Sequence, residues 1–467
     1  MLDVYCRSFD WERAWYPIAP LRNLDASAPS RWELLGKSLV VWQSAPDATQ
    51  PTEEDDNALG WRVADDACPH RSAPLSLGTR NAQDGKLVCR YHGWAFDGAG
   101  ACASLPMGGP PAPCGLSSTL RPTTVAHGML FAWGSAGKGA SAEAAAAPPP
   151  GDAMPSWAAG AFENGVVTIA ESPASWWAFV SNGLDPCHAE FLHEGIGKFS
   201  PERASPMTAY NLESMDASGM RMRHDSYSVT RQPATGVRTF RAPCSVTTEY
   251  ADADGKATMK AHIFFVPASP RVTRVVGTFA FGDGKVVPSP PTSGPFAGLG
   301  HLVIALFHLQ NFKLVTQDLL MMQAEDRAGG PKSVTRLPSV ADSGVRALRR
   351  WLDKFGGGDV PFAPGASAEV HDVFDRWTSH TRMCASCQKT MRGALLIHRV
   401  LRVTAPLAAL GAAVAQAKAR PSLASVLFAT AAIAWLLAGV AQRLATAFVR
   451  GPGADAAYDR ALLWPSK

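Results

Sequence analysis

Two short pairs of cysteine and histidine constrain this chain more than any other feature of its sequence. In the stretch CPHRSAPLSLGTRNAQDGKLVCRYHGW, Cys68 is followed by His70 and Cys89 by His92. Turn-forming residues surround both pairs, so each pair is expected at the tip of a β-type loop. Thiolate and imidazole groups are common metal ligands, and two of each in matched loops predict a metal centre.

Two kinds of centre use two cysteines and two histidines. A structural zinc ion binds all four side chains on one metal, whereas a [2Fe–2S] cluster of the Rieske type places two cysteines on one iron and two histidines on the other. A zinc finger takes both histidines from one recognition helix. No such helix is indicated here, because Pro69 and Pro74 lie in one loop and Gly93 in the other. The pattern favours the iron–sulfur cluster.

Length and composition indicate a globular protein of more than one domain. The 467 residues exceed what one hydrophobic core usually supports, so two or three domains are expected. Hydrophobic residues make up 46% and charged residues 18%, which provides enough core. The net charge of +4 comes from scattered basic residues without interleaved aromatics, so nucleic acid is not an expected partner.

The cysteines do not form a disulfide scaffold. Four of the nine fall into two pairs, Cys68 with Cys89 and Cys384 with Cys387, which indicates metal or redox use in a reducing compartment. The first twenty residues resemble neither a signal peptide nor a transit peptide, so no targeting segment is visible. The remaining cysteines are expected to be small buried residues: Cys6, Cys102, Cys114, Cys187 and Cys244.

Hydrophobic patterning divides the chain into an α+β arrangement. Short apolar runs broken by turns predict a small all-β domain over 13–136, followed by an Ala-, Gly- and Pro-rich linker over 137–156. Strands flanked by a few helices predict an antiparallel-sheet domain over 157–380. A segment with two cysteines follows at 381–392, and an apolar helical hairpin at 395–450.

The hairpin is long and apolar enough for a membrane. Residues 422–442 carry no charge and suffice to cross a bilayer, while the first arm, 403–417, is shorter and contains Pro406. The alternative is a buried amphipathic helix. Only Lys418 and Arg420 lie at the tip, so the positive-inside rule places the large N-terminal body on the cytoplasm-like face. The basic residues at the flanks are Lys389, Arg392, Arg399, Arg402, Arg443 and Arg450.

The motifs CPHR and CRYHGW resemble the Rieske domains of ring-hydroxylating oxygenases. Respiratory and photosynthetic Rieske subunits carry an additional cysteine in each loop, and CPHRSAPLS has none. The resemblance therefore implies a cluster of lower potential that is reduced by a ferredoxin-like donor.

A Rieske cluster transfers one electron, so oxygen chemistry requires a second metal with open coordination positions, typically Fe(II) bound by two histidines and one carboxylate. The stretch NGLDPCHAEFLHEG resembles the Asn-x-x-Asp-x-x-His-x-x-x-x-His pattern of Rieske oxygenases, with Asn182, Asp185, His188 and His193 at the matching positions. His188 and His193 are then two iron ligands. A spacing of five requires a helix end or a local widening, which Gly195 and Gly197 fit; the alternative is one surface and one buried histidine.

The third ligand is expected to be a carboxylate far along the chain. Asp318, in VTQDLLMMQAEDR, lies on an apolar helix-like stretch where an unpartnered acid would be costly, and it resembles the Gln-Asp position of the family. Glu325 and Asp326 are the alternatives, although both are expected at a solvated helix end.

In the family, an aspartate at the position of Asp185 connects a Rieske histidine of one subunit to an iron-ligating histidine of its neighbour. The resemblance thus implies electron transfer across a subunit boundary and a ring of subunits, usually three. An Asp–His hydrogen bond suits this role, because it fixes the imidazole tautomer and raises ligand basicity. The alternative is that Asp185, before Pro186, is a helix N-cap.

A CxxC pair before the hairpin narrows the resemblance. Cys384 and Cys387 alone could be redox-active, half of a zinc site, or two ordinary cysteines. A Rieske oxygenase that ends in His-Thr-x-x-Cys-x-x-Cys and an apolar hairpin is similar to the pheophorbide a oxygenase group of chloroplasts, as are FDWERAWYPIAPLRNLD and CRYHGWAFDGAGAC. The segment around Cys187 and the Ala/Pro-rich linker depart from that group.

This resemblance implies a monooxygenase that uses O₂ and ferredoxin electrons to oxygenate an apolar tetrapyrrole such as pheophorbide a. It also implies a chloroplast envelope or thylakoid location with the catalytic body on the stromal side. Such substrates dissolve in membranes and need a large apolar pocket. The alternative is a redox-sensing inner-envelope component, similar to an import-associated Rieske protein, in which the CxxC pair is a thiol switch.

Overall fold

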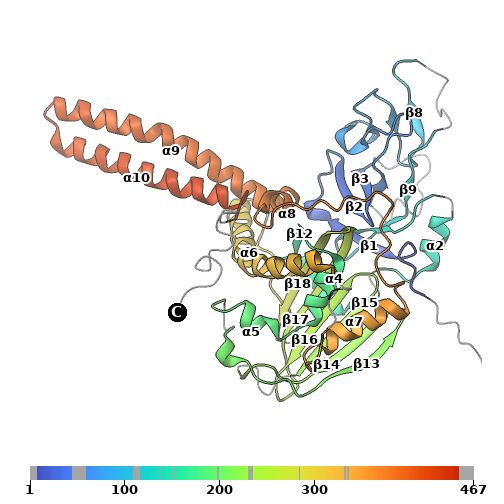
Figure 1. The fold of residues 1–467 in the computed structure, drawn as a ribbon. Coiled ribbons are helices and arrows are strands. Elements are labelled where there is room, and N and C mark those ends of the chain that lie inside the picture. The colour runs from blue at the N-terminus through green and yellow to red at the C-terminus, as the bar shows by residue number, and fades with distance from the viewer. Residues whose placement is uncertain are drawn as a thin grey trace, which may run out of the picture. The chain divides into compact units, whose positions relative to one another are not determined.

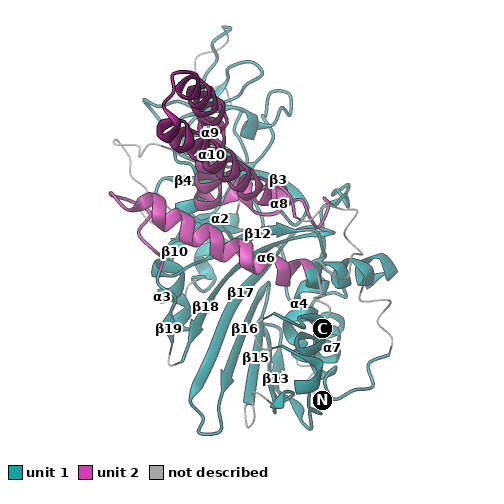
Figure 2. Cartoon of the chain, turned by 90° about the vertical axis from the view of Figure 1, so that its left-hand side faces the viewer, with its two compact units in different colours: residues 1–288, 317–370 teal, residues 289–316, 371–467 magenta. Residues whose placement is uncertain are grey.

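The computed structural model forms two compact units, which Figure 2 colours separately. Unit 1 comprises residues 1–288 and 317–370, and unit 2 comprises residues 289–316 and 371–467. Helix α6 (Ala297–Ala328) contributes residues to both units. The structure describes residues 8–44, 59–108, 116–137, 139–150, 152, 154–196, 199–229, 235–282, 284–330, 333 and 336–451. Cys6, Cys114 and Gly197 lie outside these residues.

The N-terminal part of unit 1 consists of three small antiparallel sheets, ordered β1-β11-β10, β2-β3-β4-β9 and β5-β6-β7-β8. Their core contains Val40, Trp42, Leu87 and Phe96, which are all fully buried. The strands are β1 (Trp15–Pro20), β2 (Ser30–Leu34), β3 (Lys37–Gln43), β4 (Trp61–Asp65), β5 (Thr79–Arg80), β6 (Leu87–Val88), β7 (Ala95–Phe96), β8 (Cys102–Ser104), β9 (Leu120–Arg121), β10 (Thr123–Ala126) and β11 (Met129–Trp133).

The segment expected to be a linker contains a helix. Alanines at three successive positions end α2 (Ala140–Ala146), and alanine has the highest intrinsic helix propensity. Ala140 and Ala144, one turn apart, pack against Trp133. Composition indicated a loop, whereas burial of two small side chains on an indole stabilises a short helix.

The second part of unit 1 is built on an eight-stranded antiparallel sheet with the order β12-β18-β17-β16-β15-β14-β13, and β19 pairs with β18 (Figure 1). A small β domain followed by an antiparallel sheet with helices confirms the expected fold class. The strands are β12 (Thr168–Ser172), β13 (Tyr210–Asp216), β14 (Gly219–His224), β15 (Thr235–Arg241), β16 (Ser245–Ala251), β17 (Ala257–Ser269), β18 (Val272–Phe281) and β19 (Lys285–Val286).

Aromatic side chains connect the helices to this sheet. Trp176 of α4 and Trp351 of α7 both contact the buried Phe240 of β15, at ring-centroid distances of 5.8 and 4.9 Å. Trp11 lies edge-on to Trp176 at 5.1 Å, a favoured geometry for aromatic pairs. The helices are α3 (Ser156–Asn164), α4 (Trp176–Leu184), α5 (His188–Leu192) and α7 (Ser343–Lys354).

The stretch PASWWAFVSNGLDPCHAEFLH, expected to be helical throughout, forms two helices. Helix α4 ends at Leu184, Asp185 has an extended backbone with φ −104° and ψ 100°, and α5 begins at His188. A residue that precedes proline avoids the helical region because the proline ring clashes with it. Pro186 therefore interrupts the helix between Asp185 and His188.

Unit 2 contains a pair of long apolar helices that lie side by side (Figures 1 and 2). These are α9 (Ala385–Ala417) and α10 (Pro421–Ala447), preceded by the short α8 (Arg376–Ser379). Ala424, Ala431, Ala438 and Ala445 of α10 are buried, and a seven-residue spacing places them on one face. The first helix is longer than the predicted arm over 403–417, since it begins at the CxxC pair and continues through Pro406.

Large apolar side chains cover the outer faces of this pair. Leu410, Phe428, Trp435 and Leu436 are each more than half exposed. Both helices are long and apolar enough to cross a membrane, by length and composition. The segment of each helix that meets this criterion is mostly exposed, unlike the core helix of a soluble protein.

Charged residues on the outer faces are expected to weaken membrane attachment. Leu410→Lys and Leu436→Lys each place an ammonium group near the middle of an uncharged stretch, 403–417 and 422–442, at a cost of about 3 kcal/mol in a bilayer. The wild-type chain should resist extraction by alkaline carbonate, and the double variant should be released. Leu212→Lys, at an exposed leucine of β13, is the matched control and should remain in the pellet. Release of the wild-type chain would contradict membrane insertion.

Candidate functional site

Two loops of the N-terminal β domain are built by the same pair of backbone hydrogen bonds. The amide of Cys68 donates to the carbonyl of Ala73 at 2.8 Å, and the amide of Cys89 donates to the carbonyl of Trp94 at 2.8 Å. In each loop, the amide four residues after the cysteine donates back to the cysteine's carbonyl. Gly93 adopts φ +71°, a conformation that glycine tolerates best. The loops therefore present their cysteines and histidines in equivalent positions.

The cysteines of these loops point inward and the histidines outward. Cys68 and Cys89 are each 2% exposed and belong to the same core cluster. His70 is exposed and His92 is half-buried, and their ring centroids lie 4.7 Å apart. Burial, together with the neighbouring Cys89, raises the pKa of the Cys68 thiol. Two adjacent buried thiols with two outward imidazoles fit a cluster whose histidine-bound iron lies at the surface.

The second group of predicted ligands lies beside the eight-stranded sheet. His188 is the first residue of α5, and His193 follows the last residue of this five-residue helix. Gly195, with φ +78°, continues the turn. The spacing of five is thus explained by a helix end, one of the two possibilities that the sequence left open, and it allows both imidazoles to face one point.

A carboxylate of α6 faces the same point. Oδ1 of Asp318 lies 3.5 Å from Nε2 of His188 and 3.4 Å from Nε2 of His193. One ligand atom from each of the three side chains lies within 4.8 Å of the others. Ligands at right angles around a metal, with bonds of about 2.1 Å, are separated by about 3 Å. The described geometry therefore fits a mononuclear metal bound by two histidines and one carboxylate.

Outer contacts fix the orientation of these ligands. Nδ1 of His193 lies 3.0 Å from Oε1 of the fully buried Gln317, an oxygen that can only accept a hydrogen bond. The Nδ1 atom therefore carries the proton and Nε2 faces Asp318. Nδ1 of His188 lies 3.6 Å from Oδ2 of Asp185. Nδ2 of Asn182 donates to Oδ1 of Asp318 at 3.2 Å.

Burial and neighbouring charges shift the pKa values of three side chains in this group. Burial raises the pKa of Asp318, although the two histidines act in the opposite direction. Burial acts to lower the pKa of His188, but Asp185 and Asp318 outweigh it and raise that pKa. Burial likewise acts to raise the pKa of Asp185, and the facing His188 and the Cys187 amide hold it below its usual value. This group of side chains therefore favours positive charge between the two carboxylates, and a metal ion supplies such a charge.

The alternative carboxylates have structural partners. Oδ1 and Oδ2 of Asp326 accept from the hydroxyl and amide of Ser175 at 2.5 and 2.7 Å, and Oε1 of Glu325 accepts from the indole of Trp177 at 2.8 Å. Both acids therefore hold the N-terminus of α4. The expectation of a solvated helix end was wrong, because the sequence does not show which segment packs against α6.

Asp185 is not the N-cap of α5, since Cys187 occupies that position. Its Oδ1 accepts from the amide of Cys187 at 3.0 Å, and its side chain remains 36% exposed. The carboxylate therefore stabilises the turn before α5 and faces His188 at the same time.

Three supporting residues were not predicted. Tyr210 donates to the carbonyl of Leu184 at 2.7 Å, and the buried Arg238 donates to the carbonyl of Gly183. These two contacts satisfy the C-terminal carbonyls of α4, which have no partner within the helix. Gln317 orients His193, and its place next to Asp318 was the only indication in the sequence.

Loss of the Gln317 contact should weaken iron binding. Gln317→Leu leaves Nδ1 of His193 without its acceptor, and loss of such a partner typically lowers metal affinity by roughly 10–100-fold. Iron titration of the metal-depleted chain should show this change. Gln310→Leu, at an exposed glutamine of the same helix, should bind iron like the wild-type chain. Equal affinity of the two variants would exclude the orienting role.

The remaining cysteines follow the expectation in part. Cys102 and Cys244 are buried, whereas Cys187 is only half-buried. Cys384 and Cys387 lie in unit 2, where both are buried next to His308 and His380.

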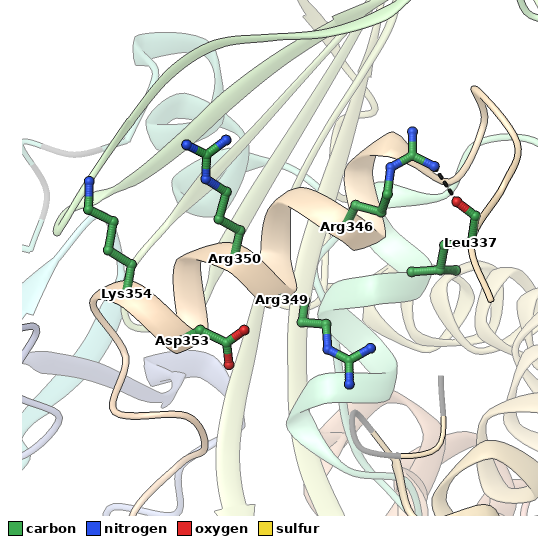
Figure 3. A pocket seen from close by; sticks show the side chains of 6 residues that line it. All are labelled: Leu337, Arg346, Arg349, Arg350, Asp353 and Lys354. Atoms are coloured by element: carbon green, nitrogen blue, oxygen red, sulfur yellow. Dashed lines mark hydrogen bonds between the residues drawn. The ribbon is translucent and has the colours of Figure 1, made fainter. Parts of the chain in front are cut away.

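A separate open cavity of about 510 Å³ lies along α7 (Figure 3). It is lined by Leu337, Asp353 and four basic side chains, and Arg346 donates to the carbonyl of Leu337. None of the predicted ligands lines this cavity. Its basic lining does not suit an apolar substrate.

Known proteins share several of these features. Residues 14–118 match the Rieske [2Fe-2S] domain. Pheophorbide a oxygenase of Oryza sativa subsp. japonica is 29% identical, covering 91% of this chain and 82% of that protein. Protochlorophyllide-dependent translocon component 52 of Arabidopsis thaliana is 26% identical, covering 85% of this chain and 76% of that protein. Flavonoid 8-hydroxylase 2 of Ocimum basilicum is 28% identical, covering 81% of this chain and 73% of that protein. All three names specify the chloroplast.

A solved structure shares the fold. Dicamba monooxygenase bound to dicamba superposes with a TM-score of 0.52 at 18% identity, covering 75% of this chain and 98% of that one. The Rieske domain and the two-histidine, one-aspartate site together define the cofactors, a [2Fe–2S] cluster and a mononuclear iron. The chain therefore carries a Rieske [2Fe-2S] domain together with a two-histidine, one-aspartate site, and it is similar to pheophorbide a oxygenase along most of its length.

Proposed function

We propose that this chain is a membrane-anchored, ferredoxin-dependent monooxygenase that oxygenates a hydrophobic tetrapyrrole such as pheophorbide a or a related chlorophyll derivative. One observation carries the oxygenase part of the proposal. His188, His193 and Asp318, distant in sequence, converge on one point in a chain that also carries a Rieske domain. An electron carrier alone has no need of such a second site.

Each predicted ligand has a defined role in this proposal. Cys68, His70, Cys89 and His92 hold the [2Fe–2S] cluster, and His188, His193 and Asp318 hold the iron. When bound, these two centres supply electrons and the activation of O₂. Asn182 donates to Asp318 and keeps its Oδ1 directed at the imidazoles, while Gln317 holds the proton of His193 away from the metal side.

Asp185 is proposed to connect neighbouring subunits. One face of its carboxylate lies beside His188, and the side chain remains accessible enough to accept a hydrogen bond from a Rieske histidine of a second copy. His70, at the outer side of its loop, is exposed and suitable as that donor. This route requires a ring of subunits, for which we propose a trimer.

The substrate class rests on the relatives and on the apolar helices. Two relatives along most of the chain have names that refer to pheophorbide a and protochlorophyllide, and tetrapyrroles of this kind partition into membranes. Helices α9 and α10 would keep the catalytic unit at a bilayer surface. We propose the chloroplast envelope or thylakoid, with the catalytic unit on the stromal side.

Turnover under ¹⁸O₂ tests this proposal. The full-length chain in detergent, with ferredoxin and its reductase, is incubated separately with pheophorbide a, protochlorophyllide and a flavone. The proposal predicts a tetrapyrrole product that has gained one ¹⁸O atom, as counted by mass spectrometry. Conversion of the flavone alone would retain the oxygenase and refute the tetrapyrrole assignment. No labelled product from any of the three, with both metal centres loaded, would reject the proposal for these substrate classes.

A second candidate function is a redox-sensing component with a thiol switch at Cys384 and Cys387. It is supported by the two free thiols, whose sulfur atoms lie within 4.8 Å of each other. Both thiols are buried, which hinders attack by a partner thiol. Turnover that survives Cys384→Ser with Cys387→Ser but is lost with His188→Ala would leave the switch at most a regulatory role.

A further inference from the structure

Unit 2 contains a second group of two cysteines and two histidines, separate from the Rieske ligands. Cys384 and Cys387 come from the start of α9, His380 follows α8, and His308 lies on α6. All four side chains are buried, at 0–3% exposure. One ligand atom from each lies within 4.8 Å of the other three. The sequence left open that the CxxC pair is half of a zinc site, and the structure places two histidines where the other half belongs.

The distances between these side chains fit four ligands around one ion. Nε2 of His380 lies 3.1 Å from Nδ1 of His308 and 3.2 Å from Sγ of Cys387. Nδ1 of His308 lies 3.4 Å from Sγ of Cys387 and 3.7 Å from Sγ of Cys384. A tetrahedral zinc ion with bonds of about 2.3 Å to sulfur and about 2.0–2.1 Å to nitrogen separates its ligand atoms by about 3.3–3.8 Å.

A two-iron cluster does not fit the same group. In such a cluster the cysteines and histidines bind different irons, so cysteine sulfur and histidine nitrogen lie at opposite ends. The contact between Cys387 and His380 is too short for that arrangement. The two cysteines are also not joined in a disulfide.

The surroundings favour a neutral metal complex. Ala305, Met391, Ala445 and Phe448 pack around the two cysteines, and the ring of Phe312 lies edge-on to His380 at 5.3 Å. Burial of a net charge in such surroundings is costly. Two thiolates and two neutral imidazoles cancel the charge of Zn²⁺, so the complex can be buried without an additional counter-ion.

We propose that His308, His380, Cys384 and Cys387 bind a structural zinc ion that fastens α6 to the beginning of α9. Four protein ligands leave no position for a substrate, which is the property of structural rather than catalytic zinc sites. The ion holds both cysteines as thiolates and keeps them from forming a disulfide with each other. This site is independent of the two iron centres and of the proposed substrate.

Metal analysis of the full-length chain, purified from cells supplied with zinc and iron, tests the proposal. The wild-type protein should contain one zinc ion per chain in addition to its iron. Cys384→Ala with Cys387→Ala should lose the zinc and retain the iron. His308→Cys, which replaces one zinc ligand by another, should keep zinc, whereas His308→Ala should lose it. Cobalt added to the zinc-depleted chain should give the visible absorption of a tetrahedral Co²⁺ thiolate.

Matched variants separate the site from general effects of substitution. Cys244→Ala removes a buried cysteine of unit 1, and His301→Gln changes a buried histidine two turns before His308 on α6. Both should retain zinc. A wild-type chain with full iron and no zinc would overturn the proposal, and so would zinc that persists undiminished in the double cysteine variant. Neither result would affect the proposed oxygenase, whose test is turnover.

Discussion

Asp318→Ala should abolish oxygenation while the [2Fe–2S] cluster remains intact. The substitution removes the only carboxylate among the three converging side chains and leaves two neutral imidazoles for the iron. Loss of an outer contact alone typically costs roughly 10–100-fold in affinity or activity, so removal of a direct ligand should cost more than about 100-fold. Substrate turnover and the electron paramagnetic resonance of the reduced cluster, measured on the same sample, check the two parts.

The control is Asp353→Ala, at an exposed carboxylate of α7. It should retain full turnover and full iron content. If Asp318→Ala kept even a tenth of wild-type turnover, then the carboxylate would not be a ligand, and the proposed site would need a different third residue.

Asp185→Asn should slow electron transfer without removing either metal. Asparagine keeps an oxygen that can accept from the Cys187 amide, so the turn before α5 should persist. It lacks the negative charge that faces His188 at 3.6 Å. By analogy with other partners of metal-bound histidines, turnover should fall by roughly 10–100-fold. Rapid mixing of the reduced protein with O₂ and substrate should show slower oxidation of the cluster.

Asp252→Asn is the matched control for this experiment. Asp252 also accepts backbone amides in a turn, but it lies in an exposed loop of the sheet. Its substitution should leave cluster oxidation unchanged. Wild-type kinetics in Asp185→Asn would show that the aspartate has only a structural role before α5.

The sequence predicted the elements of the site that depend on short stretches of chain. The two cysteine–histidine loops could be recognised because each pair is local, and a spacing of five indicated either a helix end or a local widening at His193. The position of Asp318 could be inferred because an acid on an apolar helical face needs a partner. These inferences need no knowledge of which distant segments meet.

The sequence did not predict the contacts that join distant segments. Asp326 was expected in solvent, and its partner Ser175 lies at the start of α4, far away in the sequence. His380 lies in the same motif as the CxxC pair, but His308 had no local signal that would connect it to those cysteines. The helix α2 was missed for a related reason, since burial against Trp133 decides its structure. Tertiary packing contributes to each of these features and is not visible in the local sequence.

We propose that one chain carries both a cluster and a separate iron, and chemical analysis of the purified full-length protein measures both. Three iron atoms and two acid-labile sulfides per chain are predicted, two of the irons in the cluster and the third at His188, His193 and Asp318. Asp318→Ala should contain two irons and the same two sulfides. A wild-type chain reconstituted with excess ferrous iron that still contains only two irons would contradict the claim.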